Sequence, residues 1–336
     1  MADRVALLGV GAALPPQIRS SAEVEALIEE CSPNFRLRPG TLASISGVET
    51  RRVACHDVQC SDLAAFAARR ALDVAGVGVD DVDLLIFASA GQDLIEPATA
   101  NIVQEKLGTA CQAFDVKNAC NSFLNGLQLA ESLILSGACE RAVVTSGEVC
   151  SRAISWRVRH FEDFKRNFPG YTMGDAGAAA VLGRSRDGRG IFYRRFVTIS
   201  DHWRLATVPC GGSRHPRGEE FTYLRADGKR LKQAFIDLGP DLIPTMMREA
   251  GVTFSDFSRI LIHQATLPYL HEMLDITGIP PELVEFTVSE FGNMASASLP
   301  VGYVRALERG AMRPGDRVMW LGLASGISVG MVMIDV

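Results

Sequence analysis

An internal repeat at a separation of 175 residues constrains the fold of this chain more than any other feature. Residues 75–90 have the sequence AGVGVDDVDLLIFASA, and residues 250–265 have AGVTFSDFSRILIHQA. Both combine a helix-ending Ala-Gly, a short acidic turn and an apolar run typical of a buried strand. The same separation aligns Asn118 with Asn293, each before small residues that suit a helix start. A duplicated α/β unit is therefore expected.

A third pair of segments follows in the same order. Expected strands at 141–145 and 317–321 each precede a Gly-rich return strand, at 176–183 and 326–335. Because strands alternate with helices in each half, we expect mostly parallel sheets covered by helices.

The expected halves are residues 1–183, with an insertion that begins near 150, and residues 184–336. The stretch from about 150 to 225 has little periodicity and is rich in Arg, Gly and aromatic residues. Long irregular insertions in compact α/β proteins tend to be functional or to form interfaces.

The charge of the chain is distributed unevenly. The net charge of −5 argues against nucleic-acid binding. Residues 151–232 contain 17 of the 34 basic residues but only 8 of the 39 acidic ones. This basic segment is either a solvated surface or a dock for an anionic partner, such as a phosphopantetheine carrier. Arg157, Arg159 and Arg214 are its candidate carrier-binding residues.

We expect a cytoplasmic protein without a membrane segment. No apolar run approaches the ~18 residues of a membrane span. The eight cysteines show no CxxC pair and no framework spacing, as is typical of reduced thiols in the cytosol. No metal site is expected, because the Cys55-His56 and Cys60 cluster has no second ligand pair downstream.

Cys120 is the candidate nucleophile. It follows an apolar strand at 113–116 and precedes a helical pattern of apolar residues, which places its sulfur at a helix N-terminus. That position favours a thiolate and lowers the pKa of the thiol. On position alone, a small buried structural cysteine is equally compatible.

His263 and Asn293 are candidate partners of Cys120. Alone, a histidine at the end of an apolar strand is more often structural, and a Gly-Asn pair is more often a turn. If the two halves pack pseudo-symmetrically, however, the Cys120 and Asn293 helices face one centre, with His263 beside them.

Several motifs resemble β-ketoacyl-acyl-carrier-protein synthase III, a thiolase-superfamily condensing enzyme. They are DVKNACNSFLNG, IHQA at 262–265, GN at 292–293 and GDAGAAAVL at 174–182. The resemblance covers nearly the whole chain, including the separation of 30 residues between His263 and Asn293. It implies a thiolase-like α-β-α-β-α fold, a homodimer, acyl-thioester substrates, an acyl carrier protein as partner and no further cofactor.

The resemblance also implies roles for the site residues. Cys120 takes the acyl group, while His263 and Asn293 bind the carbonyl or enolate of the second thioester. The backbone N–H groups of Cys120 and of Ser325, in LASGIS, form the oxyanion hole.

Two departures from the housekeeping enzymes concern the substrate. Thr41 and Ile45 stand where those enzymes use Trp and Arg to hold coenzyme A, so ordinary coenzyme A primer recognition is not expected. LIEPATA at 94–100 instead resembles the acyl-condensing enzymes of olefin and pyrone biosynthesis. In those enzymes a Glu before Pro, here Glu96, reaches the partner subunit's active site. Glu-Pro-Ala-Thr also suits an ordinary first helical turn.

The leading hypothesis is a Claisen condensation through acyl-Cys120. The alternative is an acyltransferase that delivers the same acyl group to a hydroxyl or amine, with His263 as base. A non-catalytic partner subunit is disfavoured because Cys120, His263 and Asn293 are all present.

Overall fold

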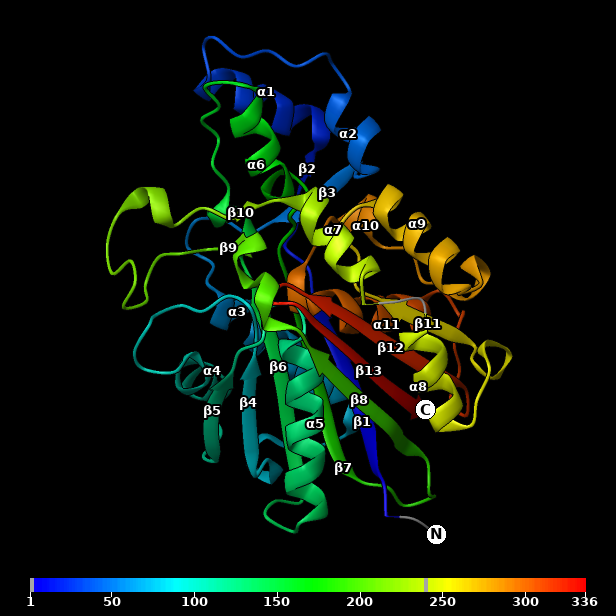
Figure 1. Cartoon of the computed structure of the whole chain (residues 1–336). Coiled ribbons are helices and arrows are strands. Elements are labelled where there is room, and N and C mark those ends of the chain that lie inside the picture. Colours follow the sequence, from blue (N-terminus) through cyan, green and yellow to red (C-terminus); the bar gives the residue numbers. More distant parts are fainter. Residues whose placement is uncertain (1–2, 239–240) are drawn as a thin grey trace.

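The computed structural model describes residues 3–238 and 241–336, which form two β-sheets between layers of helices (Figure 1). The first sheet has the order β1-β7-β6-β4-β5. Its strands are β1 (Val5–Ala13), β4 (Leu84–Ala88), β5 (Gln112–Val116), β6 (Arg141–Glu148) and β7 (Ala176–Arg184). The second sheet has the order β11-β12-β13-β8. Its strands are β8 (Gly190–Thr198), β11 (Arg259–Ile262), β12 (Arg317–Ala324) and β13 (Ser328–Asp335).

The sheets are mixed, which corrects the expectation of mostly parallel sheets. β4 is parallel to β5 and β6, and β11 is parallel to β12. The return strands β7 and β13 are each antiparallel to both of their neighbours. A turn of three residues, 325–327, joins β12 to β13, and strands joined by so short a turn must run antiparallel.

The repeat seen in the sequence matches the architecture. β4 and β11 begin 175 residues apart, and β6 and β12 begin 176 residues apart. The two sheets have the same strand order when β1, β7, β6 and β4 are matched to β8, β13, β12 and β11. The counterpart of β5 is reduced to a single parallel bridge between Ile260 and Val284.

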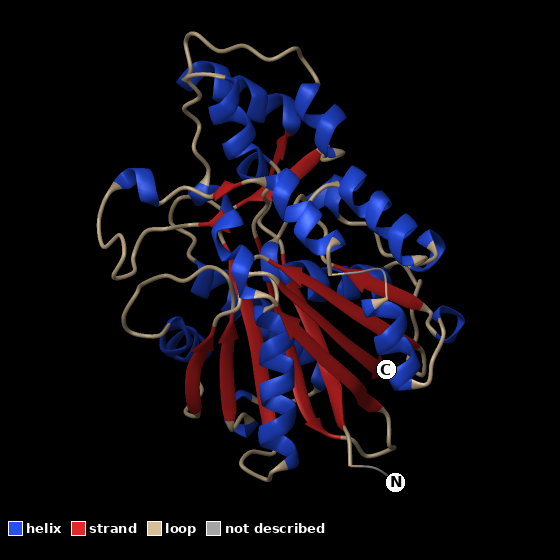
Figure 2. Cartoon of the chain, in the orientation of Figure 1, coloured by secondary structure: helices blue, strands red, loops and turns tan. Residues whose placement is uncertain are grey.

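Helices α5 (Ser122–Leu135) and α11 (Ser298–Glu308) lie between the sheets. Their apolar side chains share a core with both sheets, in which Phe123 stacks on Trp320 with ring centroids 6.0 Å apart. Helices α3 (Cys60–Ala75) and α4 (Thr99–Leu107) cover the outer face of the first sheet. Helices α8 (Leu242–Ala250) and α9 (Leu267–Thr277) cover the outer face of the second (Figure 2). The result is a five-layered α-β-α-β-α structure.

A cap of short elements stands over one end of the sheets, at the top of Figure 1. It contains β2 (Gln17–Ser20), α1 (Ser21–Cys31), α2 (Thr41–Ser46), β3 (Thr50–Val53) and α6 (Phe161–Tyr171). Its own apolar cluster includes Ile28, Phe164 and Tyr171. Within the described ranges, no helix is both long enough and apolar enough to cross a membrane.

The stretch from about 150 to 225 is not one insertion, which corrects a second expectation. β7 and β8 run through its middle as strands of the two sheets. β8 was hidden in the sequence because it is an edge strand with exposed and half-buried positions, such as Arg194 and Arg195. Outside the sheets this region contributes α6, β9 (Ala206–Thr207), β10 (Arg225–Ala226) and, just beyond it, α7 (Gly228–Ile236).

Candidate active site

A cavity of about 1240 Å³ is lined by α2 and α6 of the cap, by residues between 204 and 235, and by the end of β12 with loops beside it. Cys120, His263, Asn293 and Ser325 all line it, so the structure brings together four of the eight site residues named from the sequence. Sites for drug-sized ligands usually measure about 300–1000 Å³. This cavity therefore has room for an extended substrate.

Cys120 lies in a tight turn before α5. The preceding residue, Ala119, has φ of 47°, in the left-handed region that residues other than glycine rarely adopt. Ser122 closes the turn, since its hydroxyl donates to the carbonyl of Ala119 (2.7 Å) and accepts from the N–H of Asn118 (2.8 Å). The turn thus presents Cys120 at the start of a buried helix.

Asn121 ties this turn to the loop that carries Ser325. Its side chain is fully buried and donates to the carbonyl (3.0 Å) and hydroxyl (2.8 Å) of Ser328, the first residue of β13. On β12, a Cβ at Gly322 would lie 2.0 Å from Oδ1 of Asn121, so that only glycine fits there. The contact fixes the two expected oxyanion donors, the N–H groups of Cys120 and Ser325, relative to each other.

The protonation states of Cys120 and His263 follow from their burial. Burial, reinforced by the negative charge of Glu148, raises the pKa of the Cys120 thiol to about 12. This direction is opposite to the lowering that a helix N-terminus predicts. Burial lowers the pKa of His263 to about 4. Near neutral pH the pair is therefore a thiol and a neutral imidazole, and the thiol proton has to leave as the sulfur attacks.

His263 and Asn293 are held by hydrogen bonds of their own segments. The N–H of His263 donates to the carbonyl of Leu321 (2.9 Å), which continues the pairing of β11 with β12. The N–H of Asn293 donates to the carbonyl of Thr172 (2.8 Å), and its side-chain Oδ1 accepts from the N–H of Ala295 (2.9 Å). With Oδ1 occupied, the amide group of Asn293 is left as a donor.

Gln264 braces the segment that follows His263. Its Nε2 donates to the carbonyl of Glu285 (2.6 Å), and its Oε1 accepts from the N–H groups of Thr287 (2.9 Å) and Val288 (3.0 Å). Val288 begins α10 (Val288–Phe291), directly before Asn293. The buried amide therefore joins the two segments that carry His263 and Asn293.

Glu96 does not line the cavity of its own subunit. It is exposed in the loop between β4 and α4 and precedes a cis proline, Pro97. Its neighbours Leu94 and Ile95 are 51% and 66% exposed. The loop thus places a carboxylate and two apolar side chains on the surface.

The three arginines singled out in the basic segment also lie outside the cavity wall. Arg157 is exposed, Arg159 pairs with Asp163 (2.7 Å), and Arg214 stacks on Trp203, 5.2 Å from the ring centroid. Other basic residues of the same segment line the cavity: Lys165, Arg166, Arg204, Arg225, Lys229 and Lys232. The charge count located the segment, but only the fold shows which side chains face the cavity.

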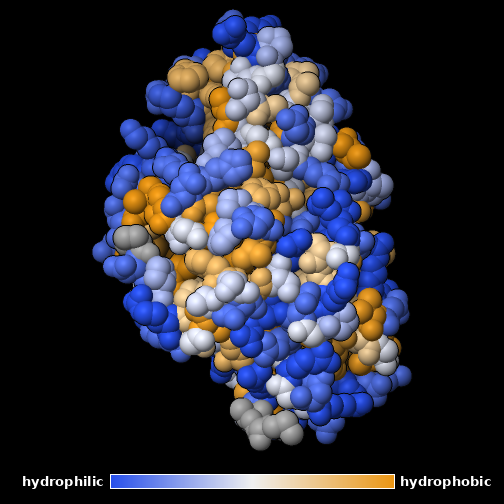
Figure 3. Space-filling view, turned by 90° about the vertical axis from the view of Figure 1, so that its right-hand side faces the viewer, coloured by the Kyte–Doolittle hydropathy of each residue, from blue (hydrophilic) through white to orange (hydrophobic). Residues whose placement is uncertain are grey.

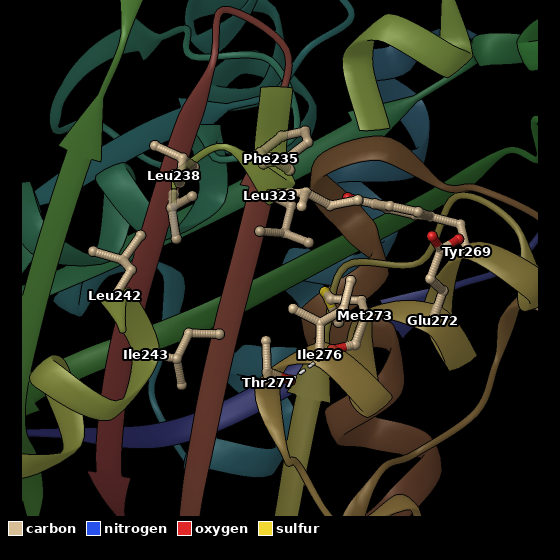
Figure 4. Close-up of a pocket in the computed structure, with 12 residues that line it drawn as sticks. Phe235, Leu238, Leu242, Ile243, Tyr269, Glu272, Met273, Ile276, Thr277 and Leu323 are labelled. Carbon is tan, nitrogen blue, oxygen red and sulfur yellow. Dashed lines mark hydrogen bonds between the residues drawn. The ribbon is translucent and has the colours of Figure 1, made fainter. Parts of the chain in front are cut away.

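A second, smaller cavity of about 60 Å³ adjoins the first (Figure 4). Four residues line both cavities: Phe235, Tyr269, Glu272 and Leu323. The remaining wall is almost entirely apolar and comes from α7, α8, α9 and β13. On the face of the molecule shown in Figure 3, hydrophobic residues gather in the middle, among more hydrophilic ones. The cavity region thus combines apolar walls with basic residues.

Comparison with known proteins gives consistent matches along the chain. The family described as 3-oxoacyl-[acyl-carrier-protein (ACP)] synthase III matches residues 114–201, and its C-terminal domain matches residues 247–336. The β-ketoacyl-[acyl-carrier-protein] synthase III of Dinoroseobacter shibae is 33% identical over 99% of both chains. The acyl-CoA:acyl-CoA alkyltransferase of Xanthomonas campestris is 28% identical over 99% of this chain and 98% of that protein.

Solved structures of OleA from Xanthomonas campestris have the same fold. A cysteine-to-alanine variant gives a TM-score of 0.90 at 27% identity and covers 99% of this chain and 97% of that one. A cysteine-to-serine variant with bound lauric acid and lauroyl-CoA gives a TM-score of 0.89 at 27% identity, over 99% of both chains.

We expect Cys120 to react slowly with iodoacetamide at pH 7. Because its pKa is raised to about 12, the reactive thiolate should increase roughly tenfold per pH unit, without a plateau up to pH 10. Peptide mass mapping of a pH series measures this rate, with the exposed Cys31 and Cys55 as internal references and Cys120→Ala as the blank. A plateau near pH 7 would show that the resting site holds a thiolate.

Proposed function

This chain belongs to the 3-oxoacyl-[acyl-carrier-protein] synthase III family of condensing enzymes, and from this premise we propose that it joins two acyl thioesters through an acyl group on Cys120. The observation that carries the proposal is the meeting of Cys120, His263, Asn293 and Ser325 in one cavity. No cofactor is required for this chemistry, and eight free cysteines fit a cytoplasmic enzyme.

In the first half-reaction, the sulfur of Cys120 attacks the carbonyl of the donor thioester. The bond to the carrier sulfur breaks, and the carrier leaves as a thiol with the proton that Cys120 gives up. The neutral imidazole of His263 is a suitable relay for this proton. The N–H groups of Cys120 and Ser325 stabilise the negative oxygen of the tetrahedral intermediate.

In the second half-reaction, the α-carbon of another thioester attacks acyl-Cys120, and a carbon–carbon bond replaces the carbon–sulfur bond. The carbon nucleophile arises by loss of carbon dioxide or by removal of an α-proton. His263 and Asn293 donate hydrogen bonds to the enolate oxygen, which strengthen as negative charge develops there.

One observation also favours the alternative, an acyl transfer to a hydroxyl or amine. An imidazole that is neutral at physiological pH can accept a proton from such an acceptor. Product analysis with two differently labelled thioesters distinguishes condensation from acyl transfer. A condensation product contains both labels in one carbon skeleton, whereas acyl transfer gives an ester or amide.

We expect incubation with an acyl thioester to add the mass of one acyl group to the protein at Cys120. The Cys120→Ala substitution should abolish this mass increase.

The His263→Ala and Asn293→Ala variants should still become acylated on Cys120. Their turnover should be at least ~10²-fold slower, the usual scale for one lost oxyanion donor. Intact-mass and turnover measurements on the same preparations separate the two half-reactions. Labelling of Cys120→Ala, or normal turnover of either of the other variants, contradicts the assigned roles.

We propose that the basic segment binds the phosphate-bearing arm of the donor, carried by an acyl carrier protein. Arg166 and Lys229 line the cavity and have no carboxylate within 4.0 Å among the described residues. Ile45, which also lines the cavity, supplies no charge to a coenzyme A ligand. Arg157, Arg159 and Arg214 lie on the same segment and would extend this basic surface toward the carrier.

The Michaelis constant for a carrier-bound substrate should therefore rise with salt, because surface charges are screened over ~8 Å at physiological ionic strength. Arg166→Glu, Lys229→Glu and Arg157→Glu should mimic high salt, the two cavity variants most strongly. Arg186→Glu is the matched control, because this exposed arginine of the same segment lies in the turn from β7 to β8 and does not line the cavity. Steady-state kinetics from low to high salt measure the effect. If the Michaelis constant changes neither with salt nor with these substitutions, the basic segment does not bind the carrier.

We further propose that the protein is a symmetric dimer in which Glu96 serves the partner subunit. The exposed loop with Leu94 and Ile95 next to Glu96 supplies apolar surface, and β5 is an edge strand of the first sheet. An unpaired edge strand is a template for pairing with another chain. A carboxylate that reaches the partner's cavity is a suitable base for removing an α-proton.

Glu96→Ala should keep the acylation of Cys120 but lose condensation. An equal mixture of Glu96→Ala and Cys120→Ala chains should recover about a quarter of wild-type activity after subunit exchange. The reason is that half of the dimers are then mixed and each mixed dimer has one intact site. Activity assays with native mass spectrometry of the mixture measure both quantities. If mixed dimers form and remain inactive, Glu96 does not act across the interface.

A further inference from the structure

Glu148, the last residue of β6, is a fully buried carboxylate that the proposed reaction does not use. Among the residues that the structure describes, no lysine, arginine or histidine lies within 4.0 Å of it. A buried charge without a counter-ion is costly unless hydrogen bonds compensate for the lost water. Buried titratable groups of this kind are concentrated at functional sites.

Glu148 accepts hydrogen bonds from two separate segments, in addition to those from Ser146 (3.4 Å) and Cys150 (3.9 Å), each two residues away in sequence. Its Oε1 accepts from the N–H of Ala90 (2.8 Å) and from the hydroxyl of Ser296 (2.5 Å), and its Oε2 accepts from the N–H of Gly91 (2.9 Å). Ala90 and Gly91 begin the loop that carries Glu96, and Ser296 lies three residues after Asn293. One carboxylate therefore joins both segments to the end of β6.

The turn that begins at Asn293 depends on this contact. Ala295 has φ of 47°, and its N–H is bonded to Oδ1 of Asn293 (2.9 Å). The next residue, Ser296, is anchored by Glu148 and by the hydroxyl of Ser146, 2.7 Å away. The Asn293 side chain is thus held within the turn by Ala295, and the next residue of the turn, Ser296, is held by Glu148.

We propose that Glu148 is a positioning residue for the second half-reaction, whose carboxylate holds the loop carrying Glu96 and the turn carrying Asn293 in one geometry. The role of Glu148 in the reaction rests on the proposed function, whereas the link between the two segments rests only on the hydrogen bonds of Glu148.

The surroundings of Glu148 supply an independent readout. Three thiols lie around it, of which Cys60 is buried and Cys120 and Cys150 are half-buried. Desolvation raises the pKa of each, with the charge of Glu148 as the next cause: Cys60 (to about 12), Cys120 (to about 12) and Cys150 (well above its usual value). Asp175 adds negative charge near Cys60 and Cys150, and Asp93 adds it near Cys60. Removing the charge of Glu148 should therefore make Cys120 alkylate faster at a given pH.

The experiment compares three variants with the wild type. Glu148→Gln keeps the shape but has one acceptor oxygen where five donors converge on the carboxylate. Ser296→Ala removes the bonds of the Ser296 hydroxyl to Glu148, to Ser146 and to the carbonyl of Ala88, and it leaves the charge of Glu148 in place. Glu131→Gln is the matched control, because Glu131 is an equally buried glutamate on α5 that pairs with Arg194 (3.0 Å) and contacts neither segment.

Hydrogen exchange of peptides covering 89–98 and 292–297 tests the link directly. Glu148→Gln should speed exchange in both peptides and accelerate alkylation of Cys120. Ser296→Ala should speed exchange only in the second peptide and leave alkylation unchanged. In both variants, acylation of Cys120 should persist while kcat for condensation falls roughly 10- to 100-fold, the scale of a misplacement near 1 Å, with little change in KM. Glu131→Gln should change none of these.

Each other outcome has a defined meaning. A folded Glu148→Gln protein with wild-type exchange in both peptides overturns the proposal, as does wild-type kcat with altered exchange. If Glu148→Gln does not fold, Ser296→Ala decides: faster exchange at 292–297 with reduced kcat supports the proposal, and wild-type values overturn it. If the wild type forms no acyl-Cys120, the proposed function fails, while the exchange data still decide whether Glu148 links the segments.

Discussion

The packing of α5 and α11 between the two sheets is the constraint on which the rest of the structure depends. Most side chains of each helix are buried, and their apolar residues pack against both sheets. A helix with so much apolar surface is stable only when neighbouring elements cover it. Since the two halves repeat the same strand order, their central helices start near each other, and the hydroxyls of Ser146 and Ser296 meet there at 2.7 Å.

This arrangement explains why the cavity lies where it does. The turn before α5 carries Cys120, and the turn before α11 carries Asn293. Both turns contain an alanine with φ of 47°, Ala119 and Ala295. The residue after each alanine differs, and so does its environment: Cys120 faces the cavity, whereas Ser296 is fully buried and bonded to Glu148.

Much of the fold and part of the candidate site could be predicted from the sequence. Repeated apolar runs locate β4, β6, β11 and β12, because their side chains are buried and leave a periodic signal. β8 was missed, since half-buried arginines at a sheet edge leave no such signal. The role of Asn121 was also missed, because its partner Ser328 is 207 residues away. The same holds for Glu148, whose contact with Ser296 spans 148 residues. Distant polar contacts have no local pattern, so only the fold shows them.

The shared backbone of the two turns has a further consequence for how one protein can carry out two successive steps. Ala119 and Ala295 have the same φ of 47°. The two turns therefore differ in the side chain that follows the alanine. A thiol follows Ala119, and a hydroxyl bound to a carboxylate follows Ala295. In a fold of this kind, substitution of a single residue in either turn can change the chemistry of the site, while the surrounding sheets and helices keep their structure.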